Sequence, residues 1–159
     1  MAMTRKRPWN RIDVPVYSLA TVDPDGVGNM NICTYISAVS MKPKLYAVAV
    51  YRGTKTLANI ESSSSVVLQL LGQDQLKLVR RLGFTTGMAG PKLGRIKTEA
   101  WSDVPCLVDA LARLELRELS RQDAGDHILM LMRVTSWCNL RDGEALTLDD
   151  LRRTGMIRS

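Results

Sequence analysis

The chain has 159 residues, of which 45% are hydrophobic and 24% are charged, and these proportions are ordinary for one globular domain with its own core. No stretch approaches the roughly 20 apolar residues that cross a bilayer, and no apolar segment follows the basic start, so we expect a cytoplasmic protein. The net charge of +6 suits phosphate-bearing ligands. The basic residues are dispersed along the chain and are not interleaved with aromatic residues, so nucleic acid is a less favoured partner.

Cysteine and histidine usage argues against a metal site. The three cysteines, Cys33, Cys106 and Cys138, are widely spaced, and His127 is the only histidine, so no zinc-binding spacing occurs. We therefore expect free thiols and no protein-bound metal. The basic residues near the start predict a flexible arm over residues 1–13, followed by a single domain over residues 14–159.

The first half of the chain predicts strands joined by hairpins. Residues 14–22, "VPVYSLATV", are rich in β-branched and aromatic side chains, and the turn "DPDG" leads into a second strand over residues 27–33. Residues 45–51 form the strongest predicted strand, because apolar side chains on both of its faces indicate central burial. A short helix with Thr54 as its N-cap is predicted over residues 54–63.

The next segments continue this alternation. A buried strand is predicted over residues 66–71, and the apolar stripe within residues 74–82 predicts an amphipathic helix. Residues 83–95 are rich in glycine and are expected to form a loop.

The last third of the chain predicts a long hairpin and a terminal helix. Apolar and charged residues alternate from Ala112 to Arg117, which indicates a strand with one buried face and one solvated face. After a turn in "SRQDAGD", residues 127–137 return as its antiparallel partner. The pair Thr147 and Asp150 resembles a capping box at the start of a helix.

About five to seven strands joined by hairpins, with two or three short helices, exclude a parallel doubly wound sheet. The sequence also contains neither a GxGxxG nor a GxxxxGK[ST] motif. We therefore predict a mainly β fold, built as a small antiparallel barrel.

Three segments could carry chemistry. Residues 29–43 place amides, hydroxyls and a thiol beside apolar residues, which suits a flat heteroaromatic ligand, although a simple strand-to-loop bend explains the same spacing. Residues 51–56, "YRGTKT", enter a helix whose free N–H groups could cradle a phosphate, and a helix cap flanked by solvated cations is equally consistent. Asp126 could orient His127, but a lone histidine at a strand start is more often structural.

Taken in chain order, several blocks resemble the flavin reductase-like family. They are "YSLATVDPDGVGNMNICTYISAVSMKPKLYAVAVYRGTKTLANI", "VVLQLLGQDQLKLVRRLG", "GPKL", "VPCLVDALARLEL" and "GDHILMLMRV". The resemblance covers roughly residues 14–140. It implies an antiparallel Greek-key split β-barrel with FMN, or alternatively FAD, in a groove at a homodimer interface.

The resemblance also implies a role for individual residues. The flavin ring would lie against Asn31, Ile32, Cys33, Thr34 and Tyr35, and the phosphate near Arg52, Gly53, Thr54, Lys55 and Thr56. The glycine-rich loop would add Thr86, Gly87 and Lys92 to the flavin contacts. The nicotinamide of NAD(P)H, the co-substrate, would dock beside Gly125, Asp126 and His127, with His127 as the catalytic residue that positions it.

The implied activity is hydride transfer from NAD(P)H to flavin, with a flavin-dependent oxygenase as one partner that could use the product. Met132 and Arg133 replace a glycine and an acidic residue of the family pattern, so two alternatives of the same fold stay open. They are an FMN-binding electron carrier and an oxidoreductase acting on another acceptor. A nucleic-acid-binding barrel that uses the basic surface is the alternative from another class.

Overall fold

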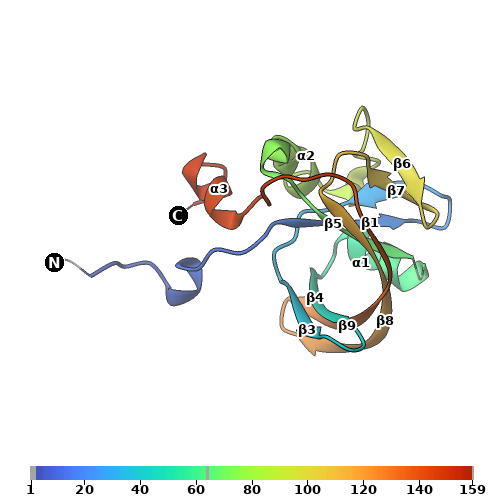
Figure 1. The fold of residues 1–159 in the computed structure, drawn as a ribbon, viewed down its shortest axis with the longest axis horizontal. Coiled ribbons are helices and arrows are strands. Elements are labelled where there is room, and N and C mark those ends of the chain that lie inside the picture. The colour runs from blue at the N-terminus through green and yellow to red at the C-terminus, as the bar shows by residue number, and fades with distance from the viewer. Residues whose placement is uncertain (1–2, 64, 159) are drawn as a thin grey trace.

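An antiparallel sheet of seven strands curls into an open barrel in the part of the chain that the computed structural model describes, residues 3–63 and 65–158 (Figure 1). The strand order is β2-β1-β5-β8-β9-β4-β3. These strands are β1 (Tyr17–Val22), β2 (Gly28–Met30), β3 (Ile36–Ser40), β4 (Leu45–Tyr51), β5 (Val66–Leu70), β8 (Ala112–Ala124) and β9 (His127–Asn139). The predicted mainly β, antiparallel split-barrel architecture is confirmed.

A hairpin and three short helices complete the fold. The hairpin pairs β6 (Thr98–Trp101) with β7 (Val104–Leu107), and the helices are α1 (Lys55–Ser62), α2 (Leu78–Gly83) and α3 (Leu148–Arg153). Single 3-10 turns occur at Pro8–Asn10, Gln73–Gln75 and Gly87–Ala89. The sequence analysis missed β6 and β7, because Pro105 interrupts the pattern and their tight turn places Ser102 and Asp103 in the left-handed region, with φ of 51° and 61°.

Local sequence signals account for the elements that border the site. Asp23 Oδ1 accepts hydrogen bonds from the N–H groups of Asp25 and Val27, and Gly26 has a φ of +81°, so the predicted turn between β1 and β2 forms. Thr54 caps α1 as predicted, because its Oγ1 accepts a hydrogen bond of 3.3 Å from Leu57 N.

Two helix and strand predictions need correction. The predicted helix over residues 74–82 is instead a 3-10 turn followed by α2, because the Gln75 side chain accepts a hydrogen bond from Gly72 N and closes the first turn separately. Central burial of β4 holds for one face only. Val48 and Val50 are buried, whereas Ala47 and Ala49 on the other face are half-buried.

The long hairpin also departs from its prediction. The charged side of β8 is not uniformly solvated, because the β6–β7 hairpin covers Arg113, whose side chain is 2% exposed. Moreover, β8 continues to Ala124, so "SRQDAGD" is strand except for a two-residue turn in which Gly125 has a φ of +66°. Strands β8 and β9 are therefore 13 residues each and carry His127 at the end of the turn.

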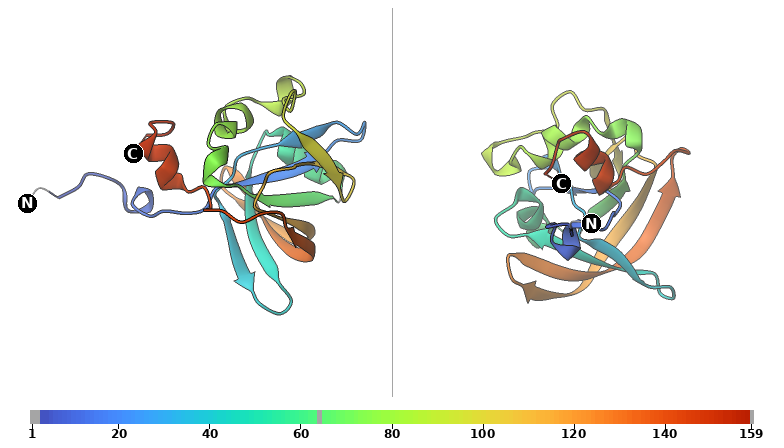
Figure 2. Two further views of the ribbon diagram at one scale, coloured as in Figure 1. Left: turned by 45° about the horizontal axis from the view of Figure 1, so that its top comes forward. Right: turned by 90° about the vertical axis from the view of Figure 1, so that its left-hand side faces the viewer.

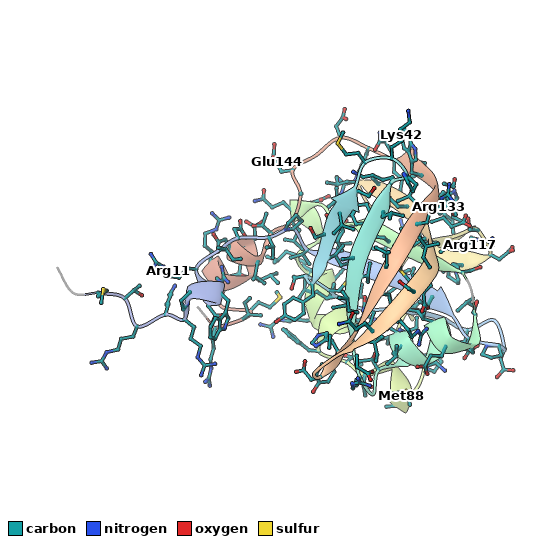
Figure 3. All side chains as sticks on the ribbon, turned by 90° about the horizontal axis from the view of Figure 1, so that it is seen from below. Arg11, Lys42, Met88, Arg117, Arg133 and Glu144 are labelled. Atoms are coloured by element: carbon teal, nitrogen blue, oxygen red, sulfur yellow. The ribbon has the colours of Figure 1, made fainter. Side chains whose placement is uncertain are left out.

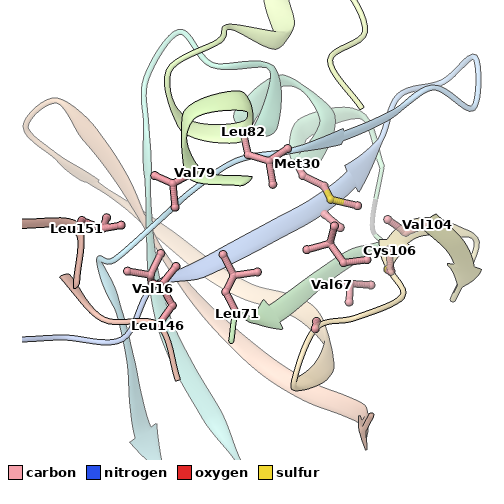
Figure 4. Close-up of a cluster of buried hydrophobic side chains, with 13 residues drawn as sticks. Val16, Met30, Val67, Leu71, Val79, Leu82, Val104, Cys106, Leu146 and Leu151 are labelled. Carbon is pink, nitrogen blue, oxygen red and sulfur yellow. The ribbon is translucent and has the colours of Figure 1, made fainter. Parts of the chain in front are cut away.

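The core consists of two clusters of buried apolar side chains. One lies between β1, β5, β7, α2 and α3 and includes Met30, Leu71 and Leu146 (Figure 4). The other lies inside the curved sheet beneath α1 and includes Leu19, Leu57 and Met130. Because α1 packs on this second cluster through Leu57 and Ile60, the barrel interior fixes the position of the helix start.

The segment before β1 extends away from the barrel beside α3 (Figure 2). It is attached where Arg152 Nη1 donates a 3.0 Å hydrogen bond to Ile12 O and where Asp149 N donates to Asp13 Oδ1. Among residues 3–63 and 65–158, no helix combines the length and the apolar character required to cross a membrane.

Candidate functional site

A cavity of about 400 Å³ opens between the β2–β3 connection and the ends of β4 and β9. The five residues predicted to contact a flavin ring, Asn31 to Tyr35, all line it, together with Thr54 and His127. Asn31 Oδ1 accepts a hydrogen bond of 2.8 Å from Leu19 N, which fixes this connection to β1. The polar connection therefore lines a cavity, as expected for a site that binds a flat ring.

Cys33 is held in this wall as a neutral thiol. Its N–H donates to Tyr17 O, and its Sγ, 3.6 Å from the same oxygen, donates to it as well. Burial raises the pKa of the Cys33 thiol far above its ordinary value. This side chain is consequently suited to line a ring and not to act as a nucleophile.

His127 lies at the open edge of the cavity between two tyrosine rings. Its Nδ1 is 2.6 Å from Asp126 Oδ1, and its ring centroid is 5.0 Å from that of Tyr35 and 5.2 Å from that of Tyr51. Tyr51 is the direct cross-strand partner of His127 in the β4–β9 pairing. The predicted Asp126–His127 contact is thus present, and it leaves Nε2 as the polar atom at the other side of the ring.

A second cavity of about 260 Å³ continues from the first, because Ile32, Thr54 and Gly83 line both. It lies at the start of α1 and is covered by the loop that follows α2. Six of its lining residues are predicted phosphate or loop contacts: Thr54, Lys55, Thr56, Thr86, Gly87 and Lys92. Its walls therefore combine hydroxyls, ammonium groups and the first turn of a helix.

Close contacts hold the start of α1 to its neighbours. Lys55 Nζ lies 3.4 Å from Asp23 Oδ2, and Thr56 Oγ1 accepts a 3.2 Å hydrogen bond from Asn29 Nδ2. Hydrogen bonding from Val27 N and the ammonium of Lys55 lower the pKa of Asp23, so this carboxylate stays charged. A Cβ on Gly87 would lie 2.2 Å from Asn29 Oδ1, so only glycine allows the loop to come this close.

Lys92 is a buried link within the covering loop. Its Nζ donates hydrogen bonds of 2.7 Å to Leu82 O and 3.0 Å to Thr85 O, and desolvation lowers its pKa. Two of its three donor directions are therefore used to fold the loop over the second cavity.

Arg52 and Gly53 line neither cavity. Arg52 instead ties β4 to the β8–β9 turn, because its Nε donates to Gly125 O at 3.0 Å and its Nη2 lies 2.7 Å from Asp123 Oδ1. Gly53, with a φ of +74°, permits the turn from β4 into the helix. The structure thus brings the other three residues of the predicted phosphate segment, Thr54 to Thr56, to the cavities but directs the Arg52 guanidinium to the turn that carries His127.

The sequence matches the model of the flavin reductase like domain over residues 9–154. The chain belongs to the flavin reductase-like family. No curated protein sequence is similar enough to this chain to count as a match. Met132 and Arg133, at which this member departs from the family pattern, line neither of the two cavities.

Solved structures with the same fold include several flavoproteins. An FMN-binding protein of Thermus thermophilus is 20% identical, with a TM-score of 0.76 over 87% of this chain and 80% of that one. Nitrilotriacetate monooxygenase component B of Mycobacterium thermoresistibile is 21% identical, with a TM-score of 0.78 over 89% and 78% of the two chains.

An NADH:FAD oxidoreductase of Streptomyces globisporus, solved with NAD and FAD fragments, is 15% identical, with a TM-score of 0.79 over 89% and 84% of the chains. A larger Sinorhizobium meliloti protein is also similar, with a TM-score of 0.78 and 18% identity, but this family member spans only 48% of that chain.

The two cavities of this family member fit a flavin nucleotide in their donor chemistry. The first offers a polar wall and aromatic side chains for a ring, and the second offers the N-terminal turn of α1, Lys55 and two threonine hydroxyls for a phosphate. By contrast, no group of three or more His, Cys, Asp or Glu side chains among residues 3–63 and 65–158 could hold a metal ion.

The predicted site residues left out three residues that line these walls: Asn29, Tyr51 and Gly83. They also left out Asp23, which pairs with Lys55. Tyr51 had a usable signal, because it ends the predicted strand over residues 45–51 and begins the candidate segment over residues 51–56. Asn29 begins the candidate segment over residues 29–43, but its place in the second cavity, like that of Gly83, depends on how the loop after α2 folds back on β2.

Proposed function

We propose that residues 14–159 form a single FMN-binding domain that reduces flavin with NAD(P)H. The observation that supports this proposal is the continuity of the two cavities, which joins a ring-sized space to a cationic, hydroxyl-lined space at a helix start. A bound flavin supplies the redox chemistry, as an acceptor of a hydride equivalent from a reduced nicotinamide. The protein supplies binding, orientation and exclusion of water.

At the phosphate end, the residues that would hold the cofactor are Thr54, Lys55 and Thr56, together with Thr86 and Gly87 of the loop. The ammonium of Lys55 and the positive end of α1 both favour a dianion. Asp23 holds Lys55 at 3.4 Å, so the ammonium is positioned before any ligand arrives. Lys92 contributes by keeping the covering loop folded.

At the ring end, Asn31 to Tyr35 would contact the flavin through backbone groups and short side chains. His127 would position the nicotinamide, because Asp126 would accept the Nδ1–H and leave Nε2 as an acceptor for the N–H of a carboxamide. Gly125 and Asp126 form the turn that presents it. We propose an orienting role for His127 and no proton relay, since hydride transfer depends foremost on geometry.

We also propose a homodimer. The outward face of β4 and β9 beside the first cavity carries half-buried Ala47, Ala49, Leu129 and Leu131, whose alternation with buried neighbours leaves an apolar strip on the barrel exterior. A flavin-dependent oxygenase is the proposed recipient of reduced flavin, and the similarity to a monooxygenase component B supports it. The three free cysteines fit a reducing cytoplasm.

Anaerobic spectroscopy tests the central proposal. The purified protein mixed with FMN should retain a flavin absorbance band near about 450 nm after gel filtration, and NADH or NADPH should bleach that band. Retention without bleaching by either nucleotide would identify a flavin-binding carrier and contradict the reductase activity. A colourless protein after gel filtration would reject both functions.

A further inference from the structure

A third cavity, of about 510 Å³, opens at the end of α1, whereas the proposed phosphate contacts lie at the start of that helix. Its lining comes from the last turn of α1, the start of β5 and the middle of β8 and β9: Ile60, Glu61, Ser62, Ser63, Val66, Arg117, Glu118, Leu119 and Met132. None of these residues lines either flavin cavity. Its volume lies in the range of about 300–1,000 Å³ that is usual for small-molecule sites, so it is a separate candidate site.

The floor of the third cavity is apolar. Ile60, Val66 and Met132 are buried members of the second core cluster, with 7%, 2% and 0% of their surfaces exposed. Leu119 lines the cavity with them but is 52% exposed. The register between β8 and β9 shifts at Leu119 and leaves it without a cross-strand partner, as in a β-bulge, which re-aims a side chain. An apolar ligand body would therefore cover both the floor and this exposed wall.

The acidic side chains of the lining already have a cationic partner. Arg121 donates hydrogen bonds of 2.7 Å to Glu118 Oε2 and of 3.4 Å to Glu61 Oε1. Arg117 differs, because it forms no ion pair with any carboxylate among residues 3–63 and 65–158. The third cavity therefore has one guanidinium to offer a ligand.

A second cation reinforces the positive charge of Arg117. Its cross-strand partner on β9 is Arg133, which likewise has no ion pair in the part of the chain that the structure describes (Figure 3). Like charges directly opposite each other destabilise a sheet, and a bound anion offsets their repulsion. Of the two departures from the family pattern, Met132 lines this cavity and Arg133 adjoins it through Arg117.

We propose that the third cavity binds a monoanionic organic acid, with its carboxylate on the Arg117 guanidinium and its apolar body against Leu119 and the floor. A planar carboxylate accepts two parallel hydrogen bonds from a guanidinium, which gives geometric specificity. Glu61 and Glu118 in the same lining repel a second negative charge, so the site favours a monocarboxylate over a phosphate ester. The site requires no flavin and so goes beyond the proposed function.

Calorimetric titration of the purified protein with 3-phenylpropionate tests this proposal. We expect saturable binding with a dissociation constant of about 1 mM or tighter. The neutral 3-phenylpropanamide has the same apolar body and should bind about tenfold more weakly, and inorganic phosphate should not compete. Absence of saturable binding, equal binding of acid and amide, or displacement by phosphate would each overturn the proposal.

Two variants separate the charge from the apolar wall. Arg117→Gln should weaken 3-phenylpropionate binding by about tenfold without changing the urea midpoint, and Leu119→Ser should weaken it several-fold. Arg80→Gln is the matched control, because Arg80 is exposed on α2 and lines none of the three cavities. Unchanged affinity in Arg117→Gln would overturn the site, and so would an equal loss in Arg80→Gln, since binding would then follow net charge.

Saturating FMN separates this site from the flavin cavities. The affinity for 3-phenylpropionate should be the same with and without FMN, and competition between the two would place the probe in the flavin cavities and overturn the proposal. If the protein binds no FMN, the proposed function fails by itself. The comparison of acid with amide and the Arg117→Gln variant then still decide whether the third cavity binds a carboxylate.

Discussion

The buried guanidinium of Arg113 joins the barrel to the hairpin that covers it. Its Nη2 donates to Leu107 O of β7 and to Glu99 Oε1 of β6, while its Nε has no hydrogen-bond partner within the described residues. Gln69, the cross-strand neighbour of Arg113 on β5, accepts a hydrogen bond from Leu107 N, so the same hairpin is held from two adjacent strands. This small polar network fixes β7 against the first core cluster.

Arg113→Ala should therefore lower the free energy of unfolding by about 2–4 kcal/mol, because it leaves a cavity and an unsatisfied buried carbonyl. Urea denaturation measures the change. Arg117→Ala is the control, since Arg117 is exposed on the same strand and should cost less than about 0.5 kcal/mol. Equal losses in the two variants would contradict the network.

Lys55 is the residue on which the proposed phosphate contact depends most. Lys55→Ala should raise the dissociation constant of FMN by about tenfold or more, because a hydrogen bond to a charged group contributes about 1.5–3 kcal/mol. Lys77→Ala removes the same charge from an exposed position outside both cavities and should leave FMN affinity unchanged. A fluorescence titration with FMN decides the matter, and unchanged affinity in Lys55→Ala would reject the phosphate assignment.

The β8–β9 hairpin is the element that presents His127, and Arg52 holds its turn through Asp123 and Gly125. Arg52→Ala should raise the KM for NADH several-fold while FMN affinity stays constant and stability falls by less than about 1 kcal/mol, since the ion pair is exposed. Asp123→Ala removes the acceptor and should reproduce these effects. If Arg52→Ala loses FMN affinity and Asp123→Ala does not, the Arg52 guanidinium contacts the phosphate and does not act through the turn.

Helix α3 carries a pH-dependent contribution to stability. The pKa of Asp150 is lowered to about 2, mainly by the hydrogen bond from Thr147 N and further by the Gln73 and Arg153 side chains. A lowered pKa in the folded protein means that this stabilisation is fully present above the unfolded value of about 4 and is lost as the pH falls toward 2. Asp150→Asn should therefore lose about 2 kcal/mol at pH 6 and much less at pH 2.5. Urea midpoints at both pH values test this, and a loss independent of pH would contradict it.

At the scale of these elements, sequence patterns were sufficient where a local interaction defines the structure. The bounds of β4, the Thr54 cap, the turn after β1 and the Thr147–Asp150 capping box all follow from residues within a few positions of one another. The alternation in β8 misled at Arg113, because the β6–β7 hairpin folds back and covers this charged position. Burial of that kind depends on tertiary packing, which no local pattern contains.

For the whole molecule, the resemblance to a family predicted the open barrel and grouped most of the candidate site. Figure 3 shows Met88 at one end of the β3-β4-β9-β8 face and Lys42 at the other, and the second cavity lies at the Met88 end, beside Gly87. Family order could not predict that Arg52 turns toward the hairpin or that Tyr35 and Tyr51 flank His127. Both arrangements depend on the tertiary pairing of strands β4 and β9, which no local sequence pattern contains.

The covering loop after α2 has one more consequence. Lys92 ties it to Leu82 O and Thr85 O, and the exposed Arg95 and Lys97 that follow are sites at which trypsin can cleave. A ligand enclosed beneath the loop would stabilise its closed form by a free energy that rises with the logarithm of the ratio of ligand concentration to dissociation constant. Added FMN should therefore slow tryptic cleavage after these residues several-fold, as followed by mass spectrometry, while cleavage in the basic segment before β1 continues at its own rate. Cleavage of this loop would then measure how much of the protein carries its cofactor in a crude extract, without purification and without any assay of turnover.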